Sequence, residues 1–130
     1  MIKFAYTILY VKDVAKSILF YEKAFAFKRK FIAPANEYGE LATGDTTLSF
    51  AAISLAKTNL SAGFSESSID GTPFGIEIAF TTENVEQTFN DAIKAGAIEV
   101  EKAKTKPWGQ IVAYVKDMDG FLIEICTPVE

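Results

Sequence analysis

The sequence predicts an α+β fold in which two βαβββ modules form one cupped mixed sheet. Short runs of β-forming residues alternate with two amphipathic helical segments, and the order of these segments in the first half recurs in the second. With 130 residues, 49% of them hydrophobic, the chain can bury a core without a metal or a disulfide. We therefore expect a single domain over residues 1–130, with a first module over 1–56, a linker over 57–73 and a second module over 74–130.

The first module opens with an alternating run over residues 4–11, which indicates a strand. Asp13 is placed to cap a helix with one apolar face. That face consists of Val14, Ile18, Tyr21 and Phe25. Further strands are expected over 27–32, 38–43 and 46–52, with a turn at Gly44-Asp45. The linker is inferred from the many Ser, Gly, Asn and Thr residues between Lys57 and Pro73.

The second module repeats that pattern. Asn84 is a candidate helix N-cap, with Gln87 as its capping-box partner, and Gly96 is placed to end the helix. Strands are expected over 75–80, 98–101, 110–115 and 121–126, with a turn over 117–120.

The repeat also relates individual positions in the two modules. A constant offset pairs Tyr6 with Glu77 and Asp13 with Asn84, and a slightly longer one pairs Ser49 with Glu124. Neither module can bury its sheet face alone, so the two sheets should join. The hollow of the resulting cup is the natural place for a ligand.

Composition excludes several classes of function. The chain contains no histidine, which is the commonest metal ligand and the usual general base, so Ser-His, Cys-His and His-metal mechanisms are excluded. A net charge of −4 makes nucleic acid a poor partner. No apolar run reaches the ~18 residues of a membrane span, so no membrane partner is expected. The lack of a signal-peptide core and the single cysteine, Cys126, predict a cytoplasmic protein.

Two glutamates interrupt strands that are otherwise apolar. The alternate positions on these strands should pack on the helices, so Glu77 and Glu124 are expected to face the cup. The apolar positions are Ile76, Ile78 and Phe80 on one strand and Phe121, Ile123 and Ile125 on the other. Two glutamates in a partly dry hollow share a proton, bind a cation or hydrogen-bond to neighbours. An open, solvated sheet face would give the same sequence pattern.

Other candidates are less specific. By the repeat, Tyr6 and Ser49 should face the same hollow, although Tyr6 equally fits a packed tyrosine. Trp108 is either an aromatic wall for a ligand or a loop anchor. Cys126 has no histidine to lower the pKa of its thiol and is expected to be a small buried hydrophobe. Glu40 is expected to be solvated.

Motifs at both ends of the chain form a set. Residues 6–13, followed by Ser17 and Phe20-Tyr21, open the first module, and residues 115–124 fit D-P-x-G-x-x-x-E with Met118 in the proline position. Together they resemble the vicinal oxygen chelate superfamily of glyoxalases, bleomycin-resistance proteins and extradiol dioxygenases. The resemblance covers nearly the whole chain. It implies the glyoxalase/bleomycin-resistance-like fold of paired βαβββ modules and a homodimer.

The resemblance also implies a ligand set. In the superfamily's metalloenzymes the cup carries His or Gln, Glu, His and Glu, and the corresponding positions here are Tyr6, Ser49, Glu77 and Glu124. Only Glu124 keeps the ligand type, so no metal and no other cofactor is expected; a hard divalent cation is the alternative. The superfamily also contains metal-free proteins that bind cationic, aromatic drugs. The negative charge, the missing histidines and the segment 107–109 resemble that branch.

The sequence therefore favours a metal-independent protein that binds a small molecule, which is cationic or aromatic. The predicted ligand-binding residues are Tyr6, Ser49, Glu77, Trp108 and Glu124. The alternative is a lyase or isomerase that resembles lactoylglutathione lyase, in which the catalytic residues are Glu124 and Glu77, with or without a divalent cation. A third hypothesis is a stable fold whose function is protein interaction.

Overall fold

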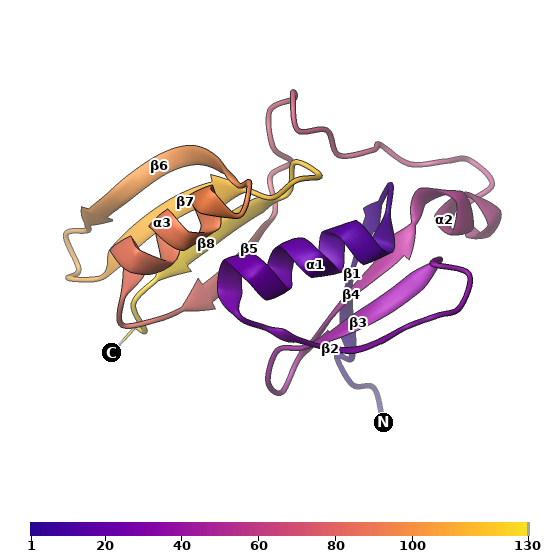
Figure 1. The fold of residues 1–130 in the computed structure, drawn as a ribbon, viewed down its shortest axis with the longest axis horizontal. Coiled ribbons are helices and arrows are strands. Elements are labelled where there is room, and N and C mark those ends of the chain that lie inside the picture. The colour runs from indigo at the N-terminus through magenta and orange to yellow at the C-terminus, as the bar shows by residue number, and fades with distance from the viewer. Residues whose placement is uncertain (130) are drawn as a thin grey trace. The chain divides into compact units, whose positions relative to one another are not determined.

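The computed structural model describes residues 1–129 and divides into two compact units. The first unit comprises residues 1–22 and 26–66, and the second comprises residues 23–25 and those from Ser67 onward. Each unit carries a four-stranded mixed sheet (Figure 1). The predicted α+β class and the repeated βαβββ order are confirmed.

The first unit has the strand order β1-β4-β3-β2, in which β1 runs parallel to β4 and the other pairs are antiparallel. Helix α1 lies across one face of this sheet (Figure 1). The buried face of the sheet includes Leu41 and Phe50, and Ile18 and Tyr21 of the helix are likewise buried. The elements are β1 (Tyr6–Val11), α1 (Val14–Phe25), β2 (Lys28–Ile32), β3 (Tyr38–Ala42), β4 (Thr47–Ala52) and α2 (Ile53–Asn59).

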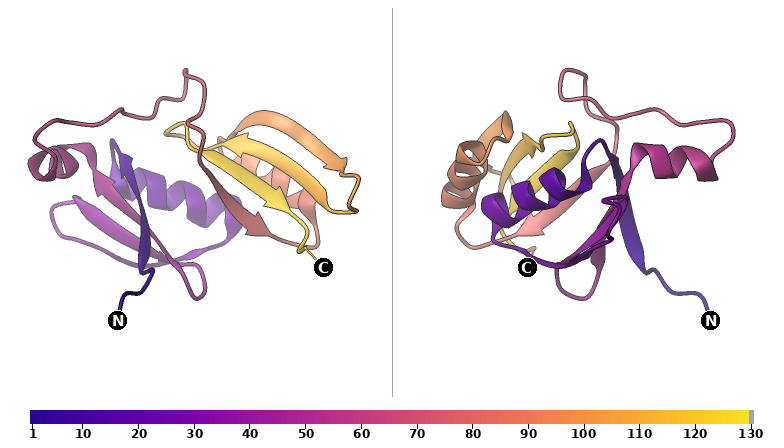
Figure 2. Two further views of the ribbon diagram at one scale, coloured as in Figure 1. Left: turned by 180° about the vertical axis from the view of Figure 1, so that it is seen from behind. Right: turned by 45° about the vertical axis from the view of Figure 1, so that its right-hand side comes forward.

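The second unit has the equivalent order β5-β8-β7-β6, again with only the first pair parallel. Seen from behind, its strands lie in front of α3, so the helix covers a single face of the sheet (Figure 2). That face includes Ile123, Ile125 and Val115, which are fully buried. The elements are β5 (Glu77–Thr81), α3 (Val85–Lys94), β6 (Ile98–Thr105), β7 (Ile111–Lys116) and β8 (Leu122–Cys126).

The ends of the two main helices differ. Asp13 caps α1 as expected, since its side chain accepts a hydrogen bond from the backbone N–H of Lys16. The capping box predicted for α3 is wrong: Asn84 makes no side-chain cap bond, and Gln87 donates to Asp91 instead. Gly96 does follow the end of α3, in the left-handed conformation that favours glycine.

Two predicted boundaries also need correction. The segment 57–73 begins inside a helix, because α2 spans Ile53–Asn59. Strand β6 extends to Thr105 rather than Glu101, with register shifts against β7 between Glu99 and Glu101 and again before Lys104. This strand forms an edge of its sheet. None of the helices within residues 1–129 is long and apolar enough to cross a membrane.

Candidate functional site

The face of the second sheet that turns away from α3 carries the polar cluster. The strand registers pair Glu77 with Leu122 and Ala79 with Glu124, so the two glutamates project from the same face as diagonal neighbours. Tyr114 of β7 is the cross-strand partner of Glu124 and joins them from the other side. Side chains of three adjacent strands thereby meet on one face.

The cluster is held together by hydrogen bonds. The Tyr114 hydroxyl donates to Oε1 of Glu124 over 2.8 Å. The carboxyl groups of Glu77 and Glu124 are close enough for each to shift the pKa of the other. The structure thus brings together the two glutamates that the sequence singled out and adds Tyr114, which the sequence analysis did not identify.

The two carboxyl groups titrate in opposite directions. Burial, followed by repulsion from the charge on Glu124, raises the pKa of Glu77 above its ordinary value. Burial also opposes ionisation of Glu124, but hydrogen bonds from Cys126, Tyr114 and Glu77 outweigh it and lower the pKa of Glu124. Of the two groups, Glu124 therefore ionises first as the pH rises, and Glu77 keeps its proton to a higher pH.

The neighbouring phenol and thiol remain protonated. Burial and the hydrogen bond to Glu124 raise the pKa of Tyr114 to about 12. Burial and Glu124 likewise raise the pKa of Cys126 to about 11. The Tyr114 hydroxyl therefore acts as a hydrogen-bond donor to Glu124, whereas the Cys126 thiol donates to the backbone carbonyl of Phe80 over 3.8 Å and is a poor nucleophile at neutral pH. Its buried side chain agrees with the expectation of a small buried hydrophobe.

Glu77 and Tyr114 open onto a hollow of about 300 Å³ within the second unit. Its other lining residues are Gly75, Ile76, Val100 and Leu122. Ile76 corrects a prediction, because it was expected to pack under a helix but is 76% exposed. It precedes β5, which begins at Glu77, so the alternation of the strand does not apply to it. The hollow combines apolar walls with two polar groups, the Glu77 carboxyl and the Tyr114 hydroxyl, as small-molecule sites do.

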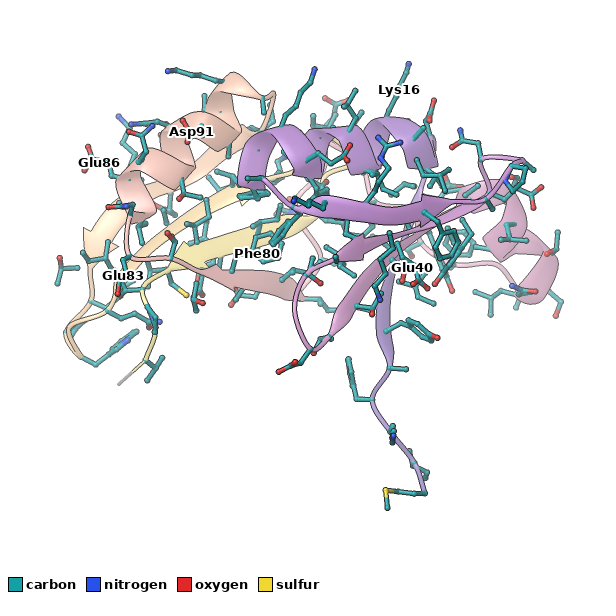
Figure 3. The ribbon with its side chains drawn as sticks, turned by 60° about the horizontal axis from the view of Figure 1, so that its bottom comes forward. Lys16, Glu40, Phe80, Glu83, Glu86 and Asp91 are labelled. Carbon is teal, nitrogen blue, oxygen red and sulfur yellow. The ribbon has the colours of Figure 1, made fainter. Side chains whose placement is uncertain are left out.

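The first unit carries a different cluster on the corresponding face. Ser49 is fully buried, and its register partner Glu40 lies beside it. The Tyr38 hydroxyl lies 2.7 Å from Oε2 of Glu40 and 3.0 Å from Oγ of Ser49. Glu40, labelled on this sheet in Figure 3, is thus partly buried and hydrogen-bonded rather than solvated as expected. Tyr6 is 53% exposed at the edge of this face.

Tyr6 and Ser49 therefore belong to one unit, and Glu77 and Glu124 to the other. The registers confirm the repeat: Ser49 pairs with Ile8, two residues after Tyr6, just as Glu124 pairs with Ala79, two residues after Glu77. The convergence of all four side chains in one hollow stays a prediction.

Trp108 lines a second hollow of the second unit, of about 430 Å³, apart from the carboxyl pair. The indole is 67% exposed, and its Nε1–H donates to Gln110, which in turn donates to the backbone carbonyl of Thr127. Glu83, labelled just before α3 in Figure 3, lines the same hollow. The tryptophan is therefore held by hydrogen bonds while its ring stays accessible.

The donor set does not fit a transition metal. Within residues 1–129, no three carboxylate or thiol side chains are placed to hold one ion together. Glu124 already accepts a hydrogen bond from Tyr114. Without histidine, two carboxyl groups are a weak site for zinc or nickel.

Comparison with known proteins extends these observations. A family model described as a glyoxalase-like domain matches residues 4–130. Lactoylglutathione lyase of Arabidopsis thaliana is 31% identical over 129 residues, which cover 95% of this chain and 43% of that protein. The chain thus spans less than half the length of the curated relatives that it matches.

Solved structures show the same fold. A glyoxalase-related enzyme from Fulvimarina pelagi has a TM-score of 0.83 at 20% identity, over 98% of this chain and 89% of that one. A glyoxalase/bleomycin resistance protein/dioxygenase family enzyme from Burkholderia phytofirmans PsJN has a TM-score of 0.81 at 23% identity, over 99% of this chain and 100% of that one. At these identities the likeness extends to the fold and no further.

Proposed function

The chain belongs to the glyoxalase-like domain family, and from that premise we propose that it is a metal-independent protein that binds a small molecule. The ligand places a cationic or hydrogen-bond-donating group against the Glu77–Glu124 pair. The observation that carries the proposal is the meeting of these two carboxyl groups beside Tyr114, with Glu77 opening onto a hollow.

The charge state of the pair supports a cationic ligand. Two carboxyl groups place negative charge beside the hollow, and Lys106 lies close enough for its charge to lower the pKa of Glu124 further. A bound cation favours the ionised form of Glu77, so its binding should release a proton at any pH low enough for Glu77 to be protonated in the free protein. Affinity for a cation should therefore rise with pH until Glu77 is fully ionised.

Isothermal titration with benzyltrimethylammonium and with bleomycin tests the proposal. We expect binding that weakens about tenfold, or 1.4 kcal/mol, in Glu77→Gln and Glu124→Gln. Glu99→Gln is the matched control, because Glu99 is an exposed glutamate on β6 outside the hollow. Titration at acidic pH in buffers of different ionisation enthalpy should reveal the released proton.

The proposal fails if neither probe binds, or if both glutamine variants bind as tightly as the parent protein. Elemental analysis gives an independent check. One equivalent of a transition metal in the purified protein would contradict metal independence.

A second candidate function is a lyase or isomerase. The observation that favours it is the pairing of a carboxyl group of lowered pKa, Glu124, with one of raised pKa, Glu77, which together can accept one proton and return another. In this function Glu124 takes a proton from a carbon acid, and Glu77 delivers its own to the product. Because the Arabidopsis thaliana relative is a lactoylglutathione lyase, lactoylglutathione is the first substrate to assay. An enzyme should lose turnover in at least one glutamine variant, whereas a binding protein shows no turnover at all.

A further inference from the structure

A turn in the linker docks on the second sheet. Residues Ser68–Gly71 form the turn, in which the Gly71 N–H donates to the Ser68 carbonyl over 3.2 Å and the Asp70 N–H donates to the Ser68 hydroxyl over 3.3 Å. It belongs to the second unit. The chain passes the end of the β7–β8 hairpin before it enters β5 (Figure 1). We call residues 68–71 the linker turn.

Lys116 of β7 holds the linker turn through its ammonium group. Nζ donates to the carbonyl oxygens of Ile69 over 2.7 Å and of Gly71 over 3.2 Å. None of the ion pairs found among residues 1–129 involves this lysine. Lys116 pairs in register with Leu122, and Leu122 pairs with Glu77, so the lysine lies in the same row across the sheet as the site. The ammonium group of Lys116 therefore binds backbone carbonyl oxygens rather than the nearby carboxyl groups.

Gly120 allows the close approach of the linker turn. Its φ is +93°, and a Cβ atom there would collide with the carbonyl group of Ser68 and lie 2.9 Å from the Ile69 nitrogen. The hairpin side of the contact is fixed by the fully buried Asp117, whose Oδ1 accepts from the N–H groups of Asp119 and Phe121, each at 2.9 Å. The linker turn therefore rests on a rigid surface that tolerates no side chain at position 120.

The linker turn is continuous with the wall of the site. Four residues after Gly71 the chain reaches Gly75 and Ile76, which line the hollow, and then Glu77. Strand β5 is short and, within residues 1–129, pairs only with β8, so its start is fixed from one side by the sheet. A fixed point at Gly71 removes much of the remaining freedom of Gly75–Glu77.

We propose that Lys116 and Gly120 form a clamp on the linker turn that positions Glu77 against Glu124. Lys116 is thus a positioning residue that acts through Glu77. The inference rests on the proposed function in one respect, namely that the carboxyl pair receives the ligand. Opening the clamp should let Gly75–Glu77 move outward and separate the Glu77 carboxyl group from that of Glu124.

Two variants open the clamp by different means. Lys116→Met keeps the length of the side chain and removes its donors, and Gly120→Ala keeps every charge and blocks docking. In both, the pKa of Glu77, followed by carbon-13 NMR of its carboxyl group, should fall toward its ordinary value. Loss of a nearby positive charge alone would raise that pKa, so the sign separates positioning from simple electrostatics. Affinity for benzyltrimethylammonium should weaken about tenfold, or 1.4 kcal/mol.

Lys116→Arg should restore the parent values, because its guanidinium also donates to carbonyls. Lys102→Met is the matched control: Lys102 is an exposed lysine on β6 and should change neither readout. Should Gly120→Ala fail to fold, Lys116→Met decides alone. A folded Lys116→Met protein with an unchanged or raised pKa of Glu77 would overturn the clamp. The pKa is measured without ligand, so failure of the cation to bind the parent protein would refute the proposed function and leave this test intact.

Discussion

The two units share one topology but present different chemistry on their open faces. In the first unit a tyrosine on β3 bonds to Glu40 on the same strand and to Ser49, whereas in the second unit Tyr114 on β7 bonds to Glu124 on β8. Glu40 and Tyr114 occupy equivalent places in the two sheets. Glu40 is the register partner of Ser49 on β4, and Tyr114 is the register partner of Glu124 on β8, the position that the repeat pairs with Ser49. Each unit thus has a tyrosine–glutamate bond, built from different positions. The faces that pack on the helices stay apolar in both, so the fold constrains one face and leaves the other free to differ.

The largest expected effect comes from replacing Ser49 of the first unit by glutamate, the residue found at the repeat-related position 124 of the second unit. Ser49→Glu places a carboxylate at a fully buried position beside Glu40, without the surroundings that accommodate Glu124. We expect a loss of about 3 kcal/mol or more in the free energy of unfolding at pH 7, measured by urea denaturation. The loss should shrink at pH 5, where the new carboxyl group is protonated. Ser49→Ala is the control and should cost about 1 kcal/mol; equal losses in the two variants would show that charge is not the cause.

Removing the two hydroxyl groups should give smaller and unequal losses. Tyr38→Phe deprives both Glu40 and the buried Ser49 of a partner and should cost about 2 kcal/mol. Tyr114→Phe removes one bond from a partly exposed carboxylate and should cost about 1 kcal/mol. It should also raise the pKa of Glu124, which loses a stabilising donor. Urea denaturation and carboxyl NMR measure these effects, and a reversed order of the two losses would contradict the comparison.

The helix caps provide a further contrast between the units. Asp13→Ala should cost about 1 kcal/mol, because its carboxylate caps α1 and accepts from the Asn36 side chain. Asn84→Ala should cost only a few tenths, about 0.3 kcal/mol, because Asn84 makes no side-chain cap bond. The hydrogen bond from Asn36, followed by that from Lys16, lowers the pKa of Asp13, so the benefit present above its ordinary value of 3.8 is lost as the pH falls through the lowered pKa. Equal losses from the two alanine variants at pH 7 would refute this contrast.

The smallest effects concern pH and the carboxyl pair. The folded state raises the pKa of Glu77, so Glu77 costs stability as the pH rises from its ordinary value of 4.5 through the raised one. The pKa of Glu124 is lowered, so Glu124 contributes stability above 4.5 that is lost on acidification. Glu77→Gln should therefore become relatively more stable with rising pH and Glu124→Gln relatively less stable, each by less than ~1 kcal/mol because the groups are partly solvated. Thermal unfolding between pH 4 and 8 checks the signs, which must be opposite.

Alternation in the sequence was sufficient to predict the shared face of Glu77 and Glu124, since both lie within short strands whose other face is apolar. Alternation could not predict that Tyr38 and Tyr114 hydrogen-bond to glutamates. The residue of a neighbouring strand that contacts a glutamate depends on the strand register, which alternation does not fix. Ile76 was misplaced because the alternation was extended one residue beyond the start of β5.

Local competition explains the other errors. The predicted capping box was wrong because the Gln87 side chain donates to Asp91 on the same helix. The backbone N–H of Asn84, which Gln87 would have bound, donates to the Thr82 hydroxyl instead. The end of β6 was missed because the charged segment 102–105 resembles a loop, although pairing with β7 keeps it extended. In each case a partner outside the motif decided the outcome.

The shape of β6 has a consequence for solubility. An unpaired strand edge of eight residues is a template for intermolecular β-pairing and fibril growth. Here the register shifts interrupt the regular hydrogen-bonding edge, and Glu99, Glu101, Lys102 and Lys104 put charge along it. These features resist addition of a further strand, so the protein should remain dispersed at concentrations where a straight, apolar edge would aggregate.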